Sequence, residues 1–148
     1  FEKVISILDK SKKAIDPLQV ALLVYHQSLH QHDMLKDFLG MVTVIESLLC
    51  NIEDLRYKFA LRATLFSESD TKKRKDLFEK LNTIYGMRNK LVHGGNASMF
   101  PYVDYWKFKE ELEPVVKKIL LQYIELAHSG KKKDEIMTQI DDLALGII

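Results

Sequence analysis

The chain has 148 residues, of which 47% are hydrophobic and 29% charged, so it can bury a sizeable core and has an ordinary globular composition. A formal net charge of +1 excludes a strong overall field that would draw the whole chain to nucleic acid or to a membrane surface. A single cysteine, Cys50, excludes an intrachain disulfide and the zinc patterns built on cysteine pairs. Its apolar surroundings predict a buried, inert thiol.

Other features of the whole chain bear on its location and partners. No apolar run approaches the roughly 20 residues of a membrane span, and the amphipathic opening segment is unlike a signal peptide. We therefore expect a cytoplasmic protein with no membrane partner. The first residue is not methionine, which leaves open that residues 1–148 form one domain of a longer protein. The basic runs 72–75 and 131–133 are interpreted as solvated faces, with nucleic-acid contact as the weaker alternative.

Apolar residues recur at helical spacing along almost the whole chain, and strand-like alternation is absent. Asp16-Pro17 and Asp33 are helix-start signals, and Ser69 or Asp70 can cap a later helix. The predicted helices cover about residues 1–13, 17–30, 34–50, 52–66, 70–93, 104–127 and 134–143. A longer loop, 94–102, follows the fifth of these helices. The sequence therefore predicts an all-α fold, a bundle of about six or seven helices in one domain.

The end of the second predicted helix carries two histidines four residues apart, His26 and His30. This spacing can chelate a metal from one helix face. Because no carboxylate motif of the zinc-protease kind accompanies them, a polar helix end is the favoured interpretation. We expect no metal and no cofactor.

Two charged residues stand inside apolar helical stripes, Glu46 in the third helix and Arg62 in the fourth. A buried carboxylate is costly unless it is paired. The favoured interpretation is an ion pair between Glu46 and Arg62, and the alternative is that Glu46 orients a site residue.

The chain is organised around the end of the fifth predicted helix, where Arg88, Asn89 and His93 precede a glycine pair, Gly94-Gly95. Glycine just past a helix end is the usual left-handed cap. Residues four apart share a helix face, so Asn89 is expected beneath His93, and the long Arg88 side chain can reach the same place. Cations are common near helix C-termini because they favour the dipole's negative end. On spacing alone, capping is therefore the stronger interpretation and phosphate chemistry the weaker one.

Three segments together resemble a known family: Ile45 to Leu49, Leu55 to Ala63, and Ile84 to Gly95. They resemble the Apea-like subgroup of the HEPN superfamily, all-α domains whose ribonuclease members carry Arg-x4-6-His. The match here runs from Arg88 to His93, with the frequent Asn directly after the Arg. The resemblance covers about residues 38–96, and the flanking helices match only in helical pattern.

The resemblance implies metal-independent cleavage of RNA, with Arg88, Asn89 and His93 as catalytic residues. A 2′-hydroxyl attacking its phosphate needs a base, an acid and a cation, and histidine titrates near pH 6.5. Arg88 is suited to hold the phosphate, while Asn89 orients it or His93. One motif supplies one histidine, so a twofold homodimer is expected to complete the site. Glu46 and Arg62 are expected to support it.

The residues around the motif leave further assignments open. Tyr85 and Lys90 are candidate substrate-binding residues, although a core or interface role is favoured for Tyr85. Gly86 weakens its helix but permits close approach of another helix or a ligand. The favoured function is an endoribonuclease related to toxin or phage-defence systems, with an antitoxin or another protein domain as a partner. The alternative is a non-catalytic HEPN-type dimerisation module, or one that binds nucleotides or RNA.

Overall fold

The computed structural model of the chain describes residues 16–30, 33–54, 56–93 and 102–147. This part is all-helical, as predicted, and contains no strand. Its helices are α2 (Pro17–His30), α3 (Met34–Leu49), α4 (Arg56–Ser67), α5 (Thr71–Val92), α6 (Tyr102–His128) and α7 (Lys133–Ala144). The helix predicted at 1–13, the glycine cap and residues 94–101 of the predicted loop 94–102 lie outside the described residues, and Tyr102, the last residue of that predicted loop, belongs to α6. No helix in the described part has both the length and the apolar character that crossing a bilayer requires.

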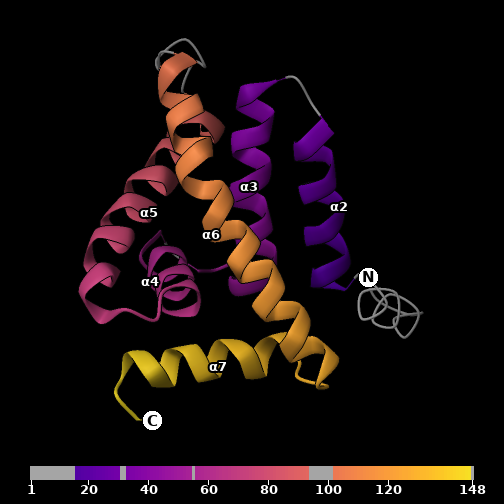
Figure 1. Cartoon of the computed structure of the whole chain (residues 1–148), viewed down its shortest axis with the longest axis vertical. Coiled ribbons are helices and arrows are strands. Elements are labelled where there is room, and N and C mark those ends of the chain that lie inside the picture. The colour runs from indigo at the N-terminus through magenta and orange to yellow at the C-terminus, as the bar shows by residue number, and fades with distance from the viewer. Residues whose placement is uncertain (1–15, 31–32, 55, 94–101, 148) are drawn as a thin grey trace.

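Helix α3 is the centre of the bundle and packs against each of the other five helices (Figure 1). Helix α2 lies along one side of it, the long α6 crosses in front, and α7 lies across the lower end of the bundle. The wide apolar stripe of α3 explains this position, because it is buried on more than one side. Its fully buried side chains are Phe38, Met41, Val42, Val44, Ile45, Leu48 and Leu49. Burial of such side chains contributes about 1.5–3 kcal/mol each.

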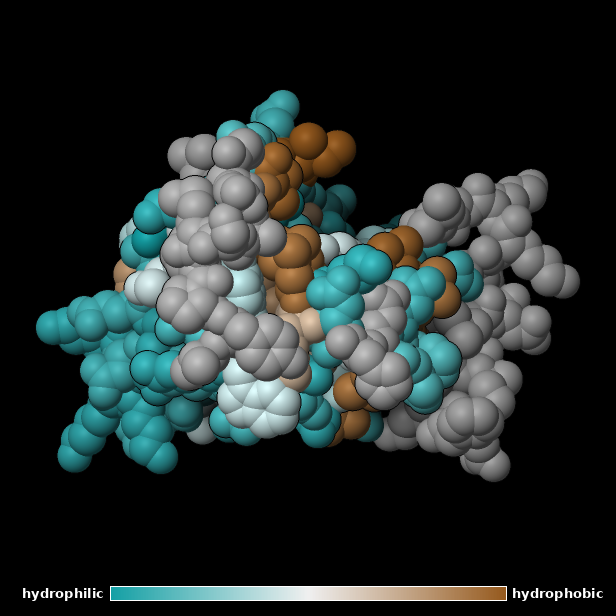
Figure 2. All heavy atoms as spheres, turned by 90° about the horizontal axis from the view of Figure 1, so that it is seen from above, coloured by the Kyte–Doolittle hydropathy of each residue, from teal (hydrophilic) through white to brown (hydrophobic). Residues whose placement is uncertain are grey.

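The surface mixes polar and apolar groups, as expected for a chain of this composition. In the view from above, hydrophobic side chains emerge in small groups between hydrophilic ones (Figure 2). Large hydrophobic side chains that are exposed include Leu29, Val92 and Trp106.

Carboxylates cap several helix starts where the sequence predicts them. Asp33 Oδ1 accepts the backbone N–H of Leu35 at 3.1 Å, and Asp70 Oδ1 accepts that of Lys72 at 2.9 Å. These contacts satisfy amide groups that have no partner inside the helix. These capping hydrogen bonds confirm the predicted starts of α3 and α5.

The predicted start of the fourth helix is wrong, because α4 begins at Arg56 and not at Ile52. A tight turn intervenes, in which the N–H of Asp54 donates to the Asn51 carbonyl at 3.0 Å. The Asp54 carboxylate also accepts the N–H of Asn51 at 2.7 Å. Side-chain hydrogen bonds of this kind compete with helix formation, and they leave Ile52 fully exposed.

The predicted ion pair between Glu46 and Arg62 is also wrong. Arg62 is 4% exposed, and its Nε and Nη2 each donate to the Asp141 carboxylate at 2.9 Å. Its Nη1 donates to Asp54 and to the Leu49 carbonyl. The buried guanidinium thus joins α4 to α7 and to the turn before α4, and carboxylates from those two places take the role expected of Glu46.

Replacing Arg62 by alanine is expected to destabilise the fold by about 3 kcal/mol, because it leaves the buried Asp54 carboxylate without its main partner. Urea unfolding followed by circular dichroism measures this change. Lys58→Ala is the matched control, since Lys58 is half-exposed and pairs with the same Asp54, and it should cost less than about 1 kcal/mol. Equal losses in the two variants would contradict the prediction.

Candidate active site

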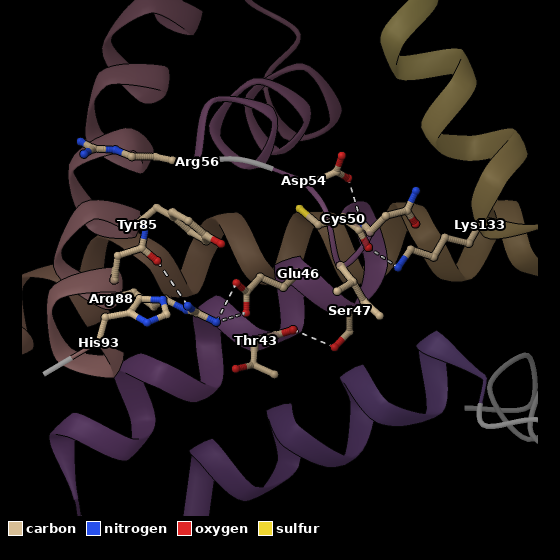
Figure 3. A pocket seen from close by; sticks show the side chains of 13 residues that line it. Thr43, Glu46, Ser47, Cys50, Asp54, Arg56, Tyr85, Arg88, His93 and Lys133 are labelled. Carbon is tan, nitrogen blue, oxygen red and sulfur yellow. Dashed lines mark hydrogen bonds and ion pairs between the residues drawn. The ribbon is translucent and has the colours of Figure 1, made fainter.

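One polar pocket of about 580 Å³ contains most of the residues singled out from the sequence (Figure 3). Its walls come from the C-terminal half of α3, the turn before α4, the end of α5 and the start of α7. The lining residues are Thr43, Glu46, Ser47, Cys50, Asn51, Ile52, Asp54, Arg56, Tyr85, Arg88, Asn89, His93 and Lys133.

The end of α5 places the three predicted catalytic residues, Arg88, Asn89 and His93, in this pocket. The helix ends at Val92, and His93 is its C-cap, with its backbone N–H donating to the Asn89 carbonyl at 3.0 Å. This confirms that His93 stands one turn above Asn89. Lys90, predicted to bind substrate, is exposed and does not line the pocket.

The motif arginine is held by the carboxylate of α3. Arg88 Nη2 lies 3.1 Å from Glu46 Oε1 and 3.3 Å from Oε2, and both side chains are about one-fifth to one-quarter exposed. Arg88 Nη1 also donates to the Asn89 side-chain oxygen at 3.3 Å. Figure 3 shows the Arg88 guanidinium directed toward Glu46. The alternative interpretation of Glu46, that it orients a site residue, therefore fits its contacts.

Tyr85 lies one turn before Arg88 and is packed on both sides. Its ring stands 4.6 Å from that of Phe59, and the Arg88 guanidinium carbon lies 5.4 Å from its centre. Burial raises the pKa of the Tyr85 phenol to about 12, and the charge of Glu46 and a hydrogen bond to it add to the increase. These contacts fit the core role favoured for Tyr85, and they hold its ring in place in the wall of the pocket.

The Cys50 thiol is buried, and this raises its pKa to about 12, so the group stays protonated at neutral pH. This agrees with the inert thiol expected from the sequence. Lys133, which was not singled out, reaches from α7 and donates to the Cys50 carbonyl. Burial lowers the pKa of Lys133.

Arg56 is another pocket residue that sequence reasoning missed. Its guanidinium packs against Gly86 of α5, where a Cβ atom would lie 2.8–3.0 Å from the guanidinium atoms. The close approach predicted at Gly86 is therefore confirmed, but the group that approaches is an arginine side chain and not the backbone of another helix or a ligand. That glycine was the one signal in the sequence that pointed toward Arg56.

Metal binding gains no support from the described residues, which contain no group of three or more His, Cys, Asp or Glu side chains placed to hold an ion. The His26 and His30 rings stack with centroids 4.3 Å apart, and His30 Nδ1 lies 2.8 Å from the His26 carbonyl oxygen. Both residues are exposed at the end of α2, outside the pocket.

Comparison of the chain with protein-family models, with curated proteins and with solved structures found no match. The chemistry of the pocket is set by its own residues. It combines a histidine, an amide and cations in a hollow open to solvent, a set suited to binding an anion and to moving a proton beside it.

Glu46→Gln is expected to lower the pKa of Tyr85 below 12, because it removes the carboxylate charge beside the phenol while leaving its burial. NMR titration of labelled tyrosine, assigned with Tyr85→Phe, measures the shift. Glu53→Gln, which changes an exposed carboxylate outside the pocket, is the control and should leave the pKa unchanged. A Tyr85 pKa unaffected by Glu46→Gln would refute this account.

The same shift has a consequence for stability. The folded state holds the Tyr85 proton more tightly than the unfolded state, where the ordinary pKa is 10.0. The contribution of the Tyr85 proton to the free energy of unfolding is therefore complete below pH 10, and it is lost as the pH rises toward about 12.

Proposed function

We propose that this protein is a metal-independent endoribonuclease of the HEPN kind, close to the Apea-like subgroup, that cleaves RNA at a site completed by a second copy of the chain. The observation that carries the proposal is the shared pocket, in which Arg88, Asn89 and His93 line one hollow at the end of α5. The all-helical bundle is compatible with it.

The chemistry follows from the residue types. The 2′-hydroxyl of a ribose attacks the adjacent phosphate as its proton passes to a base, and the leaving 5′-oxygen receives a proton from an acid. The imidazole of His93 is suited to one of these transfers, and Arg88 to stabilising the charge that builds on the phosphate. Asn89 orients the phosphate or the imidazole. Since a motif has one histidine, the second transfer is assigned to His93 of another subunit, related by twofold symmetry.

The proposal extends to the setting of the protein. An RNA-cleaving enzyme is harmful to its own cell unless it is restrained, so a role in toxin or phage-defence systems fits an antitoxin or another protein domain as regulatory partner. We place this activity in the cytoplasm, where RNA is accessible.

A second candidate function is a non-catalytic module that dimerises or binds RNA or a nucleotide. The ion pair between Arg88 and Glu46 favours it, because it partly neutralises the motif arginine. In that case Arg88 has a structural role, joining α3 to α5. A nucleotide ligand would be detected as ligand-dependent thermal stabilisation.

We expect the purified protein to cleave RNA in the presence of EDTA, and His93→Ala to slow cleavage by at least about 100-fold, because general acid–base catalysis contributes that much. Gel assays on RNAs of varied sequence measure the rate. His26→Ala removes an exposed histidine outside the pocket and should leave the rate unchanged.

Two results would count against the proposal in different ways. Activity that survives His93→Ala would refute the site assignment. A wild-type dimer that leaves all RNAs intact would favour the non-catalytic module.

The composite site makes a separate prediction about mixed dimers. When wild-type and His93→Ala subunits are mixed equally and re-associate at random, about a quarter of the dimers carry both histidines. Activity should then fall to about a quarter of that of an all-wild-type sample, measured as an initial rate at fixed total protein. Activity at half would mean that each subunit works alone.

A further inference from the structure

Arg56 differs from Arg88, the motif cation of the pocket, in that no carboxylate lies within ion-pair distance of it in the described part of the chain. Its one hydrogen bond among the described residues is from Nε to the side-chain oxygen of Asn82, at 2.7 Å. The two terminal nitrogens of the fork make no hydrogen bond there and are the groups that bind phosphate oxygens best.

The other charges that line the pocket are already engaged. Arg88 pairs with Glu46, and Lys133 donates to a backbone carbonyl. The Asp54 carboxylate is taken by Arg62 and Lys58. Among the described residues, Arg56 and Lys133 are therefore the pocket lysine and arginine side chains without a carboxylate partner, and Arg56 is the one that offers a guanidinium fork with both terminal nitrogens available to an anion.

The position of Arg56 is set by α5, the helix that carries the motif. Asn82, Gly86, Asn89 and His93 follow one another at spacings of four, three and four, which places them along one helix face. Asn82 holds the guanidinium of Arg56, and Gly86 provides the space for it. Figure 3 shows Arg56 reaching from the start of α4 across to α5. Gly86 lies about 10 Å, or two turns, from His93 along the axis.

We propose that Arg56 binds the phosphate next to the one held at Arg88 and His93, so that the pocket takes two consecutive phosphates of an RNA strand. The inference rests on the proposed function for the identity of the substrate. The proposal is argued from one face of α5. The Arg56 guanidinium lies beside Gly86 on this face, and the motif residues Asn89 and His93 follow about one and two turns further along the helix. It makes Arg56 a substrate-binding residue and gives the site a preference for substrates with a phosphate beyond the scissile one.

The test uses a 2′-O-methyl dinucleotide, which cannot be cleaved, with and without a terminal phosphate at its 5′ or 3′ end. NMR titration of the full-length protein gives the dissociation constant of each. We expect one terminal phosphate to improve binding by about tenfold in wild type, a typical effect of a charge-assisted contact. Arg56→Ala should remove this gain and leave binding of the unphosphorylated dinucleotide nearly unchanged.

Gly86→Ala is a second variant, which retains Arg56 but displaces its guanidinium. The new methyl group would meet the guanidinium at 2.8–3.0 Å, and this flexible end can swing away. Alanine also favours the helix more than glycine does. The variant should therefore fold at least as stably as wild type while losing the gain from the terminal phosphate. Lys72→Ala, which removes one exposed positive charge outside the pocket, should keep the gain in affinity from the terminal phosphate.

The outcomes separate this inference from the proposed function. A gain that persists in Arg56→Ala, or that falls equally in Lys72→Ala, overturns the second phosphate site even if His93-dependent cleavage is observed. A wild type that shows no gain from either terminal phosphate overturns it as well. A gain lost in both Arg56→Ala and Gly86→Ala supports the site, and it does so even if the wild type cleaves no RNA.

Discussion

The carboxylate of Glu46 on the central helix is the constraint on which the site depends. It stands on α3, only about one-fifth exposed, and a carboxylate so placed is costly unless a cation meets it. The cation is Arg88, from a helix that otherwise packs mainly on α4. The ion pair therefore couples the end of α5 to the centre of the bundle. It also sets the direction of the motif arginine, since a long side chain on a helix end would otherwise sample many rotamers.

The same ion pair occupies only one nitrogen of the Arg88 guanidinium, so it does not use all of its hydrogen-bond donors. Both contacts to Glu46 come from Nη2, while Nη1 donates to the uncharged amide oxygen of Asn89. A guanidinium has five N–H donors, so the remaining ones can still meet a phosphate oxygen. Under the proposed function, Glu46 would hold Arg88 in position beside the substrate, and this pre-organisation would reduce the entropy lost when a transition state is bound. The proposed chemistry therefore requires the Arg88 guanidinium to be shared between the Glu46 carboxylate and a phosphate.

The parts of the fold that could be predicted from the sequence are those controlled by local chemistry. Helical periodicity and capping carboxylates such as Asp33 and Asp70 act within a few residues, and the structure bears them out. The partner of Arg62 could not be predicted in this way, because Asp141 is 79 residues away and meets it only once α7 crosses α4. Pairing Glu46 with the nearest buried arginine in sequence was wrong for that reason. The motif residues were correctly grouped because they share one helix end.

The one wrongly predicted boundary coincides with the pocket. Hydrophobic periodicity favours a helix from Ile52, yet the Asp54 carboxylate binds the N–H of Asn51 and closes a turn instead. That turn supplies part of the pocket wall and delays α4 until Arg56, whose side chain then reaches α5. A helix begun at Ile52 would direct these backbone groups into intrahelical hydrogen bonds. The local departure from helical pattern is thus what opens a hollow beside His93, and Gly86 is the position on α5 that lets an arginine enter it.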